Sequence, residues 1–290
     1  MQKLLPIISL SLVFTTGCDP KSTPRPSEKP SIKDSSARIA TSGPANIVHT
    51  ALFDGGESIS HTGMKQFLGD EPIEIDFDST YHFSATASAS GPARDRERQY
   101  LGFASFDADG LGIGTYHVAK YPGSQDTTLA ADLNPGDKQI VLSDATGWNN
   151  LGTEHRCAIA WYPYTNKQGH SYPPYTYTRH FVADLWDAGA IEGNTITLLK
   201  EWTGPALTAG TAGRNAESGG SYNYALNSSL ALPETPTNFS APVTGVWEDG
   251  RYSDTIFRPG TAFIRPLVLA NWSDTGSTVT VQNFKIEVSP

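Results

Sequence analysis

The sequence predicts an all-β fold, a β-sandwich with a second and smaller β unit inserted into it. Two observations lead to this prediction. From Ala45 onward, apolar and polar residues alternate over short runs, and the 3.6-residue period of a helix is hardly seen. Turn-forming residues interrupt these runs, with 27 glycines and 20 prolines in 290 residues. The strand-like runs are too many for one small sheet, which favours a sandwich plus an added unit.

Strand patterns occur in three groups along the chain. One group precedes residue 124, one lies between residues 124 and 220, and one follows residue 220. The predicted strands are Glu71–Phe77, Tyr81–Ser88, Gln99–Phe106, Gly114–Lys120, Gln139–Ser143, His155–Tyr162, Tyr175–Val182, Thr195–Leu199, Tyr222–Leu226, Thr237–Val246, Ala262–Leu269 and Thr278–Val288.

Changes in amino-acid composition along the chain indicate the domain boundaries. Turn signals at Asn134–Asp137 and Asp144–Gly147 bracket one short strand, and Gly and Thr become frequent further on. We therefore expect residues 124–220 to form the inserted β domain. Residues 41–123 and 221–290 would combine into the sandwich around it.

The first 17 residues are typical of a secretory signal peptide. Lys3 provides a basic start, Leu4–Phe14 is an apolar run, and Thr15–Gly17 are small residues suited to cleavage. The apolar run is too short to span a bilayer as a helix. The sequence therefore predicts an exported protein.

The end of this signal resembles a bacterial lipobox, in which a Cys is acylated and becomes the new N-terminus. Gly17-Cys18 carries the resemblance, whereas Thr15 stands where a lipobox usually has Leu, so an ordinary secretory signal stays open as the alternative. Residues 18–40 are expected to be a disordered tether, because Asp19–Ser36 is rich in Pro, Ser and Lys. The resemblance implies a membrane-anchored lipoprotein on the periplasmic side or the cell surface, acylated at Cys18.

Charge and cysteine content exclude several classes of function. The net charge of −9 argues against nucleic acid and against anionic membrane surfaces as partners. With Cys18 acylated, Cys157 is the second of only two cysteines, so no disulfide framework is expected. Cys157 stands in an apolar strand pattern, which favours an inert buried thiol.

The stretch Trp161–His180 is unusually aromatic, with one Trp, five Tyr and three Pro in twenty residues. Alternation would place Tyr162 and Tyr164 on one strand face, and Tyr175, Tyr177 and Arg179 on another, with a turn between. One interpretation is a β-hairpin whose rings pack on a small core. The other is a rigid aromatic surface that binds a flat, hydroxylated ligand such as a sugar ring.

Two families are resembled by different parts of the chain. Ile73–Ala89, Gln99–Gly114 and Phe257–Ser289 resemble strands of a CenC-like jelly-roll carbohydrate-binding module of the cellulose- and xylan-binding kind. Thr127–Trp148 and Pro173–Arg179 resemble small β domains of phage tail-fibre and virion proteins. The resemblances imply a galactose-binding-like jelly roll with a tail-fibre-like insertion, and surface recognition rather than chemistry.

Three carboxylates form the one enzyme-like pattern. Glu74, Asp76 and Asp78 alternate and would share a strand face, and retaining glycoside hydrolases use paired carboxylates. The spacing resembles the E-x-D-x-E signature of family 16 glycoside hydrolases, although Asp78 is shorter than the Glu expected there. The alternative is a set of solvent-facing acids on a strand. We expect no catalytic residue, with this triplet as the competing interpretation.

No cofactor is expected, apart from a structural calcium ion that modules of the resembled kind often carry. Asp54 and Glu57 are the candidate oxygen ligands. Asp107-Ala108-Asp109-Gly110 looks like a calcium loop at first, but its continuation favours a hairpin turn. The histidines lack metal-ligand spacing, and no GxSxG turn is present.

The expected function is non-catalytic recognition of a glycan or polysaccharide through exposed aromatic residues. The alternatives are a glycan-active enzyme and a structural or adhesive module that binds another protein. The candidate ligand-binding residues are Trp272, Tyr162, Tyr164, Tyr172, Tyr175, Tyr177, Arg179 and Trp202.

Overall fold

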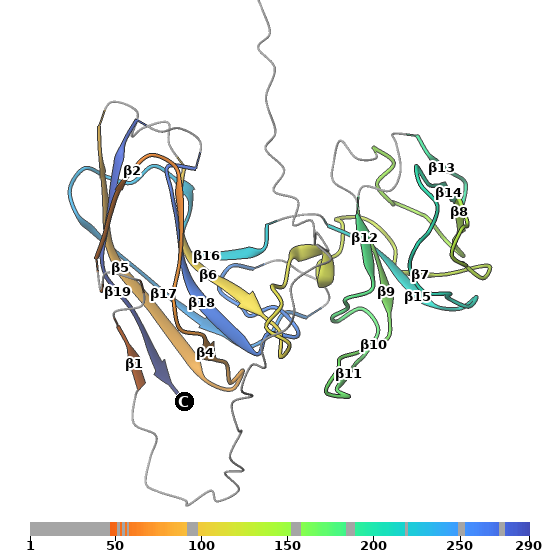
Figure 1. Ribbon diagram of the computed structural model, residues 1–290, viewed down its shortest axis with the longest axis horizontal. Coiled ribbons are helices and arrows are strands. Elements are labelled where there is room, and N and C mark those ends of the chain that lie inside the picture. The colour runs from red at the N-terminus through yellow and green to blue at the C-terminus, as the bar shows by residue number, and fades with distance from the viewer. Residues whose placement is uncertain are drawn as a thin grey trace, which may run out of the picture. The chain divides into compact units, whose positions relative to one another are not determined.

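Two antiparallel sheets face one another in a computed structural model of the chain (Figure 1). The first sheet has the order β1-β19-β5-β17, and β2 also pairs with β19. Its strands are β1 (Ile47–His49), β2 (Ser58–Thr62), β5 (Thr80–Ser90), β17 (Thr237–Thr244) and β19 (Thr278–Ser289).

The second sheet has the order β16-β6-β18-β3, and β4 also pairs with β18. Its strands are β3 (Lys65–Leu68), β4 (Ile73–Glu74), β6 (Gln99–Phe106), β16 (Tyr222–Leu230) and β18 (Phe263–Ala270). From β16 to β19 each successive strand crosses to the other sheet, as in a jelly roll. The all-β sandwich predicted from the sequence is confirmed.

The structure describes residues 47–50, 53, 56, 58–91, 98–151, 158–183, 189–217, 220–248, 253–272 and 276–290, which all belong to one compact unit. Several predictions lie outside these residues. They are the signal peptide, the tether, the acylated Cys18, the calcium ligands Asp54 and Glu57, and the inert thiol of Cys157. No helix among the described residues is long and apolar enough to cross a membrane.

Alternation along β5 builds the core of the sandwich. Tyr81, Phe83 and Ala85 point inward and are buried, and Ala87 and Ala89 continue the row, whereas the residues between them face outward. The ring of Phe83 stacks on Phe103 of β6 at a centroid distance of 5.1 Å. The inward faces of the two sheets thus form a single apolar cluster.

A β-bulge keeps both halves of β19 in the same core. Val281 and Phe284 are both buried, although residues three apart in a regular strand point to opposite faces. The pairing with β5 shifts between Gln282 and Lys285, and Asn283 has a φ of 52°. The extra residue restores the inward direction for the second half of the strand.

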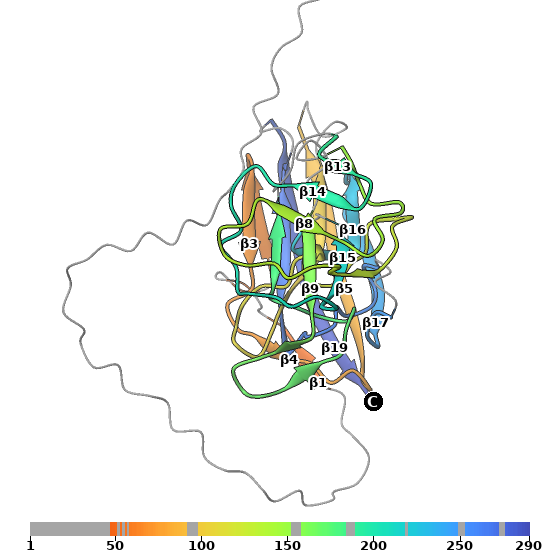
Figure 2. The ribbon, with the colours of Figure 1, turned by 90° about the vertical axis from the view of Figure 1, so that its right-hand side faces the viewer.

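In the described part of the chain between β6 and β16, nine strands form three small sheets of their own, and we call them the insertion. Their orders are β12-β9-β15-β7, β13-β14-β8 and β10-β11. Figure 2 shows β9 and β15 running side by side. The strands are β7 (Thr127–Thr128), β8 (Gln139–Val141), β9 (Ala158–Tyr162), β10 (Tyr164–Thr165), β11 (Ser171–Tyr172), β12 (Phe181–Ala183), β13 (Ile191–Glu192), β14 (Thr195–Thr197) and β15 (Ala212–Ala216).

Two predicted strands are wrong. Gly114–Lys120 contains instead a short 3-10 helix, η1 (Thr115–His117), because consecutive residues there are buried rather than every second one. Tyr175–Val182 enters a strand only at Phe181, because Tyr175 has a φ of 66° and turns the chain. The predicted turn at Asn166–Gly169 is confirmed, and it joins β10 to β11.

The burial of Phe83 predicts a large loss of stability when its ring is removed. Phe83→Ala should lower the free energy of unfolding by about 3–5 kcal/mol, because lost apolar burial adds to the cost of a cavity. Urea unfolding followed by tryptophan fluorescence measures this change. His82→Ala is the matched control, since His82 is the adjacent outward-facing residue and should change stability by no more than about 0.5 kcal/mol. Equal effects of the two changes would contradict the assigned strand faces.

Candidate functional site

The carboxylate of Asp107 joins the sandwich to the insertion. It follows β6 directly and accepts hydrogen bonds through Oδ1 from the backbone N–H groups of Asp109 and Leu111, at 3.0 and 2.9 Å. Through Oδ2 it accepts the Tyr177 hydroxyl at 2.7 Å and Arg179 Nε and Nη2 at 2.9 and 2.6 Å. The predicted Asp-Gly turn is therefore confirmed, and its Asp holds two side chains of the aromatic stretch.

The Arg179 guanidinium donates hydrogen bonds within this junction. Its Nη1 donates to the Gly112 carbonyl at 2.8 Å, and its Nη2 donates to the Leu111 carbonyl at 2.7 Å. The same Nη1 lies 3.3 Å from Nε2 of His117, whose Nδ1 lies 2.8 Å from the Thr178 carbonyl. An acceptor at Nε2 requires the neutral tautomer with its proton on Nδ1.

The surroundings set the charge states of this network. Burial, followed by the positive charge of Arg179, lowers the pKa of His117 to about 3, so the ring is neutral near pH 7. Burial raises the pKa of Asp107, but hydrogen bonds from Leu111 and Tyr177 and the charge of Arg179 outweigh it and lower the pKa below its ordinary value. Asp107 therefore stays ionised opposite Arg179.

A second ion pair, between the buried Arg214 and the half-buried Asp126, holds the loop that contains Tyr175. Arg214 on β15 binds the two carboxylate oxygens of Asp126 at 2.8 and 3.0 Å, and its Nη1 donates to the Tyr175 carbonyl at 2.9 Å. The Arg214 guanidinium also lies 5.1 Å from the centroid of the Tyr175 ring, and the Tyr175 hydroxyl donates to the Thr127 carbonyl at 3.0 Å. These contacts hold Tyr175 in its left-handed backbone conformation, which is uncommon for a residue other than Gly.

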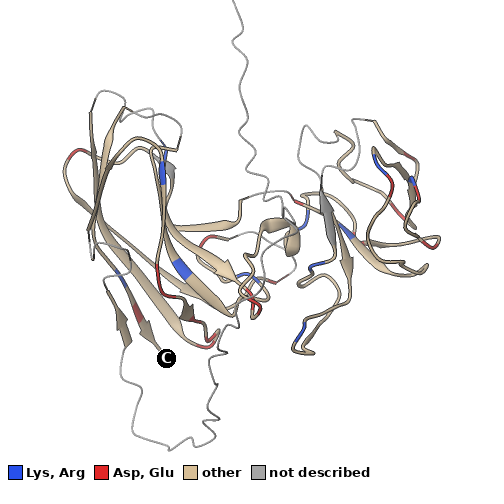
Figure 3. Ribbon diagram, in the orientation of Figure 1, with Lys and Arg blue, Asp and Glu red and all other residues tan. Residues whose placement is uncertain are grey.

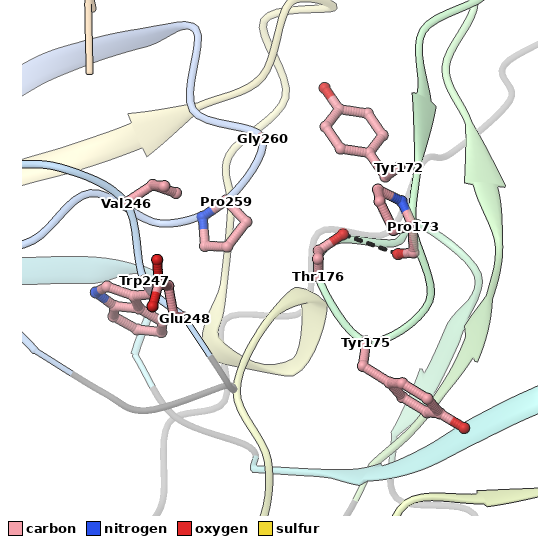
Figure 4. A pocket seen from close by; sticks show the side chains of 9 residues that line it. All are labelled: Tyr172, Pro173, Tyr175, Thr176, Val246, Trp247, Glu248, Pro259 and Gly260. Atoms are coloured by element: carbon pink, nitrogen blue, oxygen red, sulfur yellow. Dashed lines mark hydrogen bonds between the residues drawn. The ribbon is translucent and has the colours of Figure 1, made fainter. Parts of the chain in front are cut away.

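An open cleft of about 480 Å³ lies where these supports meet the sandwich. Figure 4 shows Tyr172, Pro173 and Thr176 on one side, and Val246 and Pro259 on the other. The described residues that line it are Tyr172, Pro173, Tyr175, Thr176, Val246, Trp247, Glu248, Pro259 and Gly260. We call this space the Tyr172–Trp247 cleft.

Close packing supports the sandwich side of the cleft. The Trp247 indole N–H donates to the carbonyls of Ser253 and Ile256, at 3.0 and 2.8 Å. Gly260 has a φ of 84°, and a Cβ there would lie 2.8 Å from the Tyr177 ring. Only glycine lets the chain approach Tyr177 this closely.

The lining is mainly apolar, with few polar groups. The Tyr172 ring, two prolines and Val246 offer apolar surface, and the Thr176 hydroxyl is occupied because it donates to the Pro173 carbonyl at 2.8 Å. The exposed carboxylate of Glu248 is the charged group of the lining. Such a surface suits a small ring-shaped ligand with apolar faces and polar edges.

The structure divides the candidate ligand-binding residues into three groups. Tyr172 and Tyr175 line the cleft, and the half-buried Tyr164 stacks on Tyr172 at 6.1 Å. Tyr162, Tyr177 and Trp202 are 1%, 0% and 4% exposed. These three side chains belong to the interior, so the expected exposure does not hold for them.

Two further candidates have different surroundings. Arg179 is tied to Asp107, and Trp272 is 40% exposed in the loop after β18, outside the cleft lining. The backbone N–H of Trp272 donates to the Arg98 carbonyl at 2.9 Å. Trp272 is therefore a separate exposed aromatic on the sandwich.

The three enzyme-like carboxylates do not share a strand face. β4 ends at Glu74, and the chain turns at once, with Asp76 accepting hydrogen bonds from the Asp78 backbone N–H at 3.1 Å and the Ser79 hydroxyl at 3.4 Å. Asp76 thus serves as the side-chain acceptor of a turn. Glu74 and Asp76 still line a second hollow of about 410 Å³ beside Tyr81.

Among the described residues, no group of three or more His, Cys, Asp or Glu side chains is arranged to hold a metal ion. The calcium expectation depends on Asp54 and Glu57, which lie outside those residues, and stays a prediction.

Comparison with models of known protein families gives no match. Comparison with curated protein sequences also gives no match.

Sequence reasoning did not single out Val246, Glu248, Pro259 or Gly260. They follow the aromatic stretch by some seventy residues or more, and no local pattern distinguishes them from ordinary loop residues. The Pro-Gly pair at 259 signals a turn but does not indicate which surface the turn faces.

The buried pair at the junction predicts a specific stability loss. Asp107→Asn should lower the free energy of unfolding by about 1.5–3 kcal/mol, because the partly buried Arg179 guanidinium loses its counter-charge and its charge-assisted hydrogen bonds. Urea unfolding measures this loss. Glu287→Gln breaks the exposed pair with Lys285 and should cost at most about 1 kcal/mol. A loss in Asp107→Asn no larger than in Glu287→Gln would show that the junction contributes little.

The lowered pKa of Asp107 also predicts a pH dependence. A carboxyl with a depressed folded-state pKa contributes stability above its unfolded-state pKa of about 3.9, and this contribution is lost as the pH falls through the lower folded value. The stability difference between the wild type and Asp107→Asn should therefore shrink below about pH 4. Urea titrations at a series of acidic pH values test this, and a difference that stays constant to the lowest pH would contradict it.

Proposed function

We propose that the protein binds a glycan without cleaving it, and that the Tyr172–Trp247 cleft is the binding site. The observation that carries the proposal is the composition of the cleft. A half-buried aromatic ring, two prolines and Val246 form its walls, and one exposed carboxylate stands among them. Sugar rings present apolar C–H faces and hydroxyl edges, and this lining offers a partner to each of them.

The rigidity of the cleft supports binding as its role. Its insertion side is held through the Asp107 and Arg214 networks, and its sandwich side through Trp247 and Gly260. A site whose walls are already in place loses little conformational freedom when it binds. The free energy of each contact with a ligand is then available for affinity.

We also propose that the domain is displayed outside the cytoplasm on a lipid anchor. The signal-like residues 1–17, the acylation candidate Cys18 and the Pro- and Ser-rich tether support this part of the proposal. An acyl chain on a flexible tether would hold the cleft away from the membrane, where it could meet a polysaccharide of the cell envelope.

A glycan-active enzyme is the second candidate, because Glu74 and Asp76 share one hollow with Tyr81. It predicts release of reducing ends from a polysaccharide, and loss of that release in Glu74→Gln. An assay of reducing ends on the wild type and this variant separates it from the binding proposal, which predicts no release by either protein.

The binding proposal predicts which aromatic residue matters. Tyr172→Ala should weaken binding to a recognised glycan by about tenfold or more, since a half-buried ring in the wall would be lost. Trp272→Ala is the matched control, because it removes an exposed aromatic outside the cleft lining and should leave affinity unchanged. A glycan array on the purified protein, with and without calcium, identifies the ligand, and calorimetry then measures the affinities.

Two outcomes would overturn this proposal. If no glycan binds, the protein is better explained as an adhesive module for another protein. If Trp272→Ala removes binding and Tyr172→Ala does not, the binding site lies at the loop after β18 rather than in the cleft. Unfolding curves of both variants would confirm that each of them is folded.

A further inference from the structure

The described lining of the Tyr172–Trp247 cleft carries one negative charge and no positive one. Glu248 is exposed and is the one charged residue among the nine described residues that line the cleft. No described residue forms an ion pair or hydrogen bond with its carboxylate. Figure 4 shows Glu248 on the same side of the cleft as Val246 and Pro259, which is the sandwich side. An approaching ligand would thus meet a carboxylate that can still accept hydrogen bonds.

Three arginines support the walls of the cleft, but none of them lines it. Arg179 is paired with Asp107, and Arg214 is paired with Asp126. Arg258 is fully buried, donates to the carbonyls of Ile113 and Tyr222, and lies 5.5 Å from the centroid of the Trp247 ring. The guanidinium groups are thus used within the protein.

This arrangement disfavours an anionic ligand. Figure 3 shows that Lys and Arg are sparse along the described ribbon, and the whole chain carries a net charge of −9. A carboxylated sugar in the cleft would meet Glu248, and none of the described lining residues is a cation that would balance its charge.

Resting on the glycan-binding proposal, we infer that the cleft selects sugars with a protonated amino group, and that Glu248 is the specificity-determining residue. The ammonium group would donate charge-assisted hydrogen bonds to the Glu248 carboxylate. The apolar face of the ring would pack on the Tyr172 side. The expected order of affinity is amino sugar, then neutral sugar, then uronic acid.

Three matched ligands test this order. They are β-1,4-linked tetramers of glucosamine, glucose and glucuronic acid, measured by calorimetry at about pH 6, where the amine is protonated, and at about 0.1 M salt. The wild type should bind the amino tetramer about tenfold more tightly than the neutral one, a difference of about 1.4 kcal/mol. It should bind the acidic tetramer about tenfold more weakly than the neutral one. Raising the salt concentration should narrow both gaps, since Glu248 is exposed.

Charge variants separate a local contact from the general field of the protein. Glu248→Gln should abolish the preference for the amino tetramer but keep binding of the neutral one, and Glu248→Lys should reverse the order. Glu201→Gln and Glu201→Lys are matched controls, because they make the same charge changes at an exposed residue outside the cleft lining. They should leave the order of affinity as it is in the wild type.

Each outcome decides one question. If the neutral tetramer binds and the acidic or amino forms bind equally well, or if the Glu248 and Glu201 variants behave alike, the inference is overturned while the glycan-binding proposal stands. If a lysine peptide of equal charge binds as tightly as the amino tetramer, and loses this affinity in Glu248→Gln, the cleft recognises cations rather than sugars. If none of the tetramers and no arrayed glycan binds, the proposed function itself falls.

Discussion

The carboxylate of Asp107 accepts hydrogen bonds from both parts of the fold. Its Oδ1 closes the turn that follows β6, and its Oδ2 holds Tyr177 and Arg179 of the insertion. Removing the two charges from water costs free energy, which offsets much of the attraction between them. The main effect of such a pair is therefore to fix the positions of the residues that it joins. Here the pair fixes the position of Tyr177 and Arg179. The residues just before Tyr177, Tyr175 and Thr176, line the cleft.

The rest of the site depends on this junction in two ways. Tyr177 provides the surface against which Gly260 packs, so the loop from the sandwich can approach the insertion closely. Arg214 donates a hydrogen bond to the Tyr175 carbonyl, and Asp126 in turn holds Arg214 in place. Two partly buried ion pairs and one glycine therefore keep Tyr172 and Trp247 on the two sides of one cleft. An apolar interface alone would supply area but less directional constraint.

The aromatic stretch Trp161–His180 contributes side chains both to the interior and to the lining of the cleft. Of its five tyrosines, Tyr162 and Tyr177 are interior, whereas Tyr172 and Tyr175 reach the cleft. The same twenty residues thus supply core and surface, while binding of a ligand by the surface residues stays a prediction. Strand alternation could not divide them correctly, because a turn with Tyr175 at a φ of 66° replaces the expected second strand.

Local pattern determined much of the sandwich. Residues along β5 alternate because one face meets the core and the other meets solvent, and that period is visible in the sequence. The boundaries of β6 follow directly from its apolar run, and the turns at Asn166–Gly169 and Asp107–Gly110 follow from residues that favour them. The all-β class can therefore be predicted from local alternation and from turn-forming residues.

Only the tertiary structure decided where the cleft lies and which residues form it. Glu248 and Pro259 have no neighbours in the sequence that mark them, and they become part of a site because Tyr172 and Pro173 are brought opposite them. The same applies to the residues on either side of η1, since Ile113 and Val118 share an apolar cluster with the distant Tyr177 and Trp247 and show no strand period. Sequence patterns report what a residue's own segment requires, whereas contacts between distant segments depend on how those segments pack together.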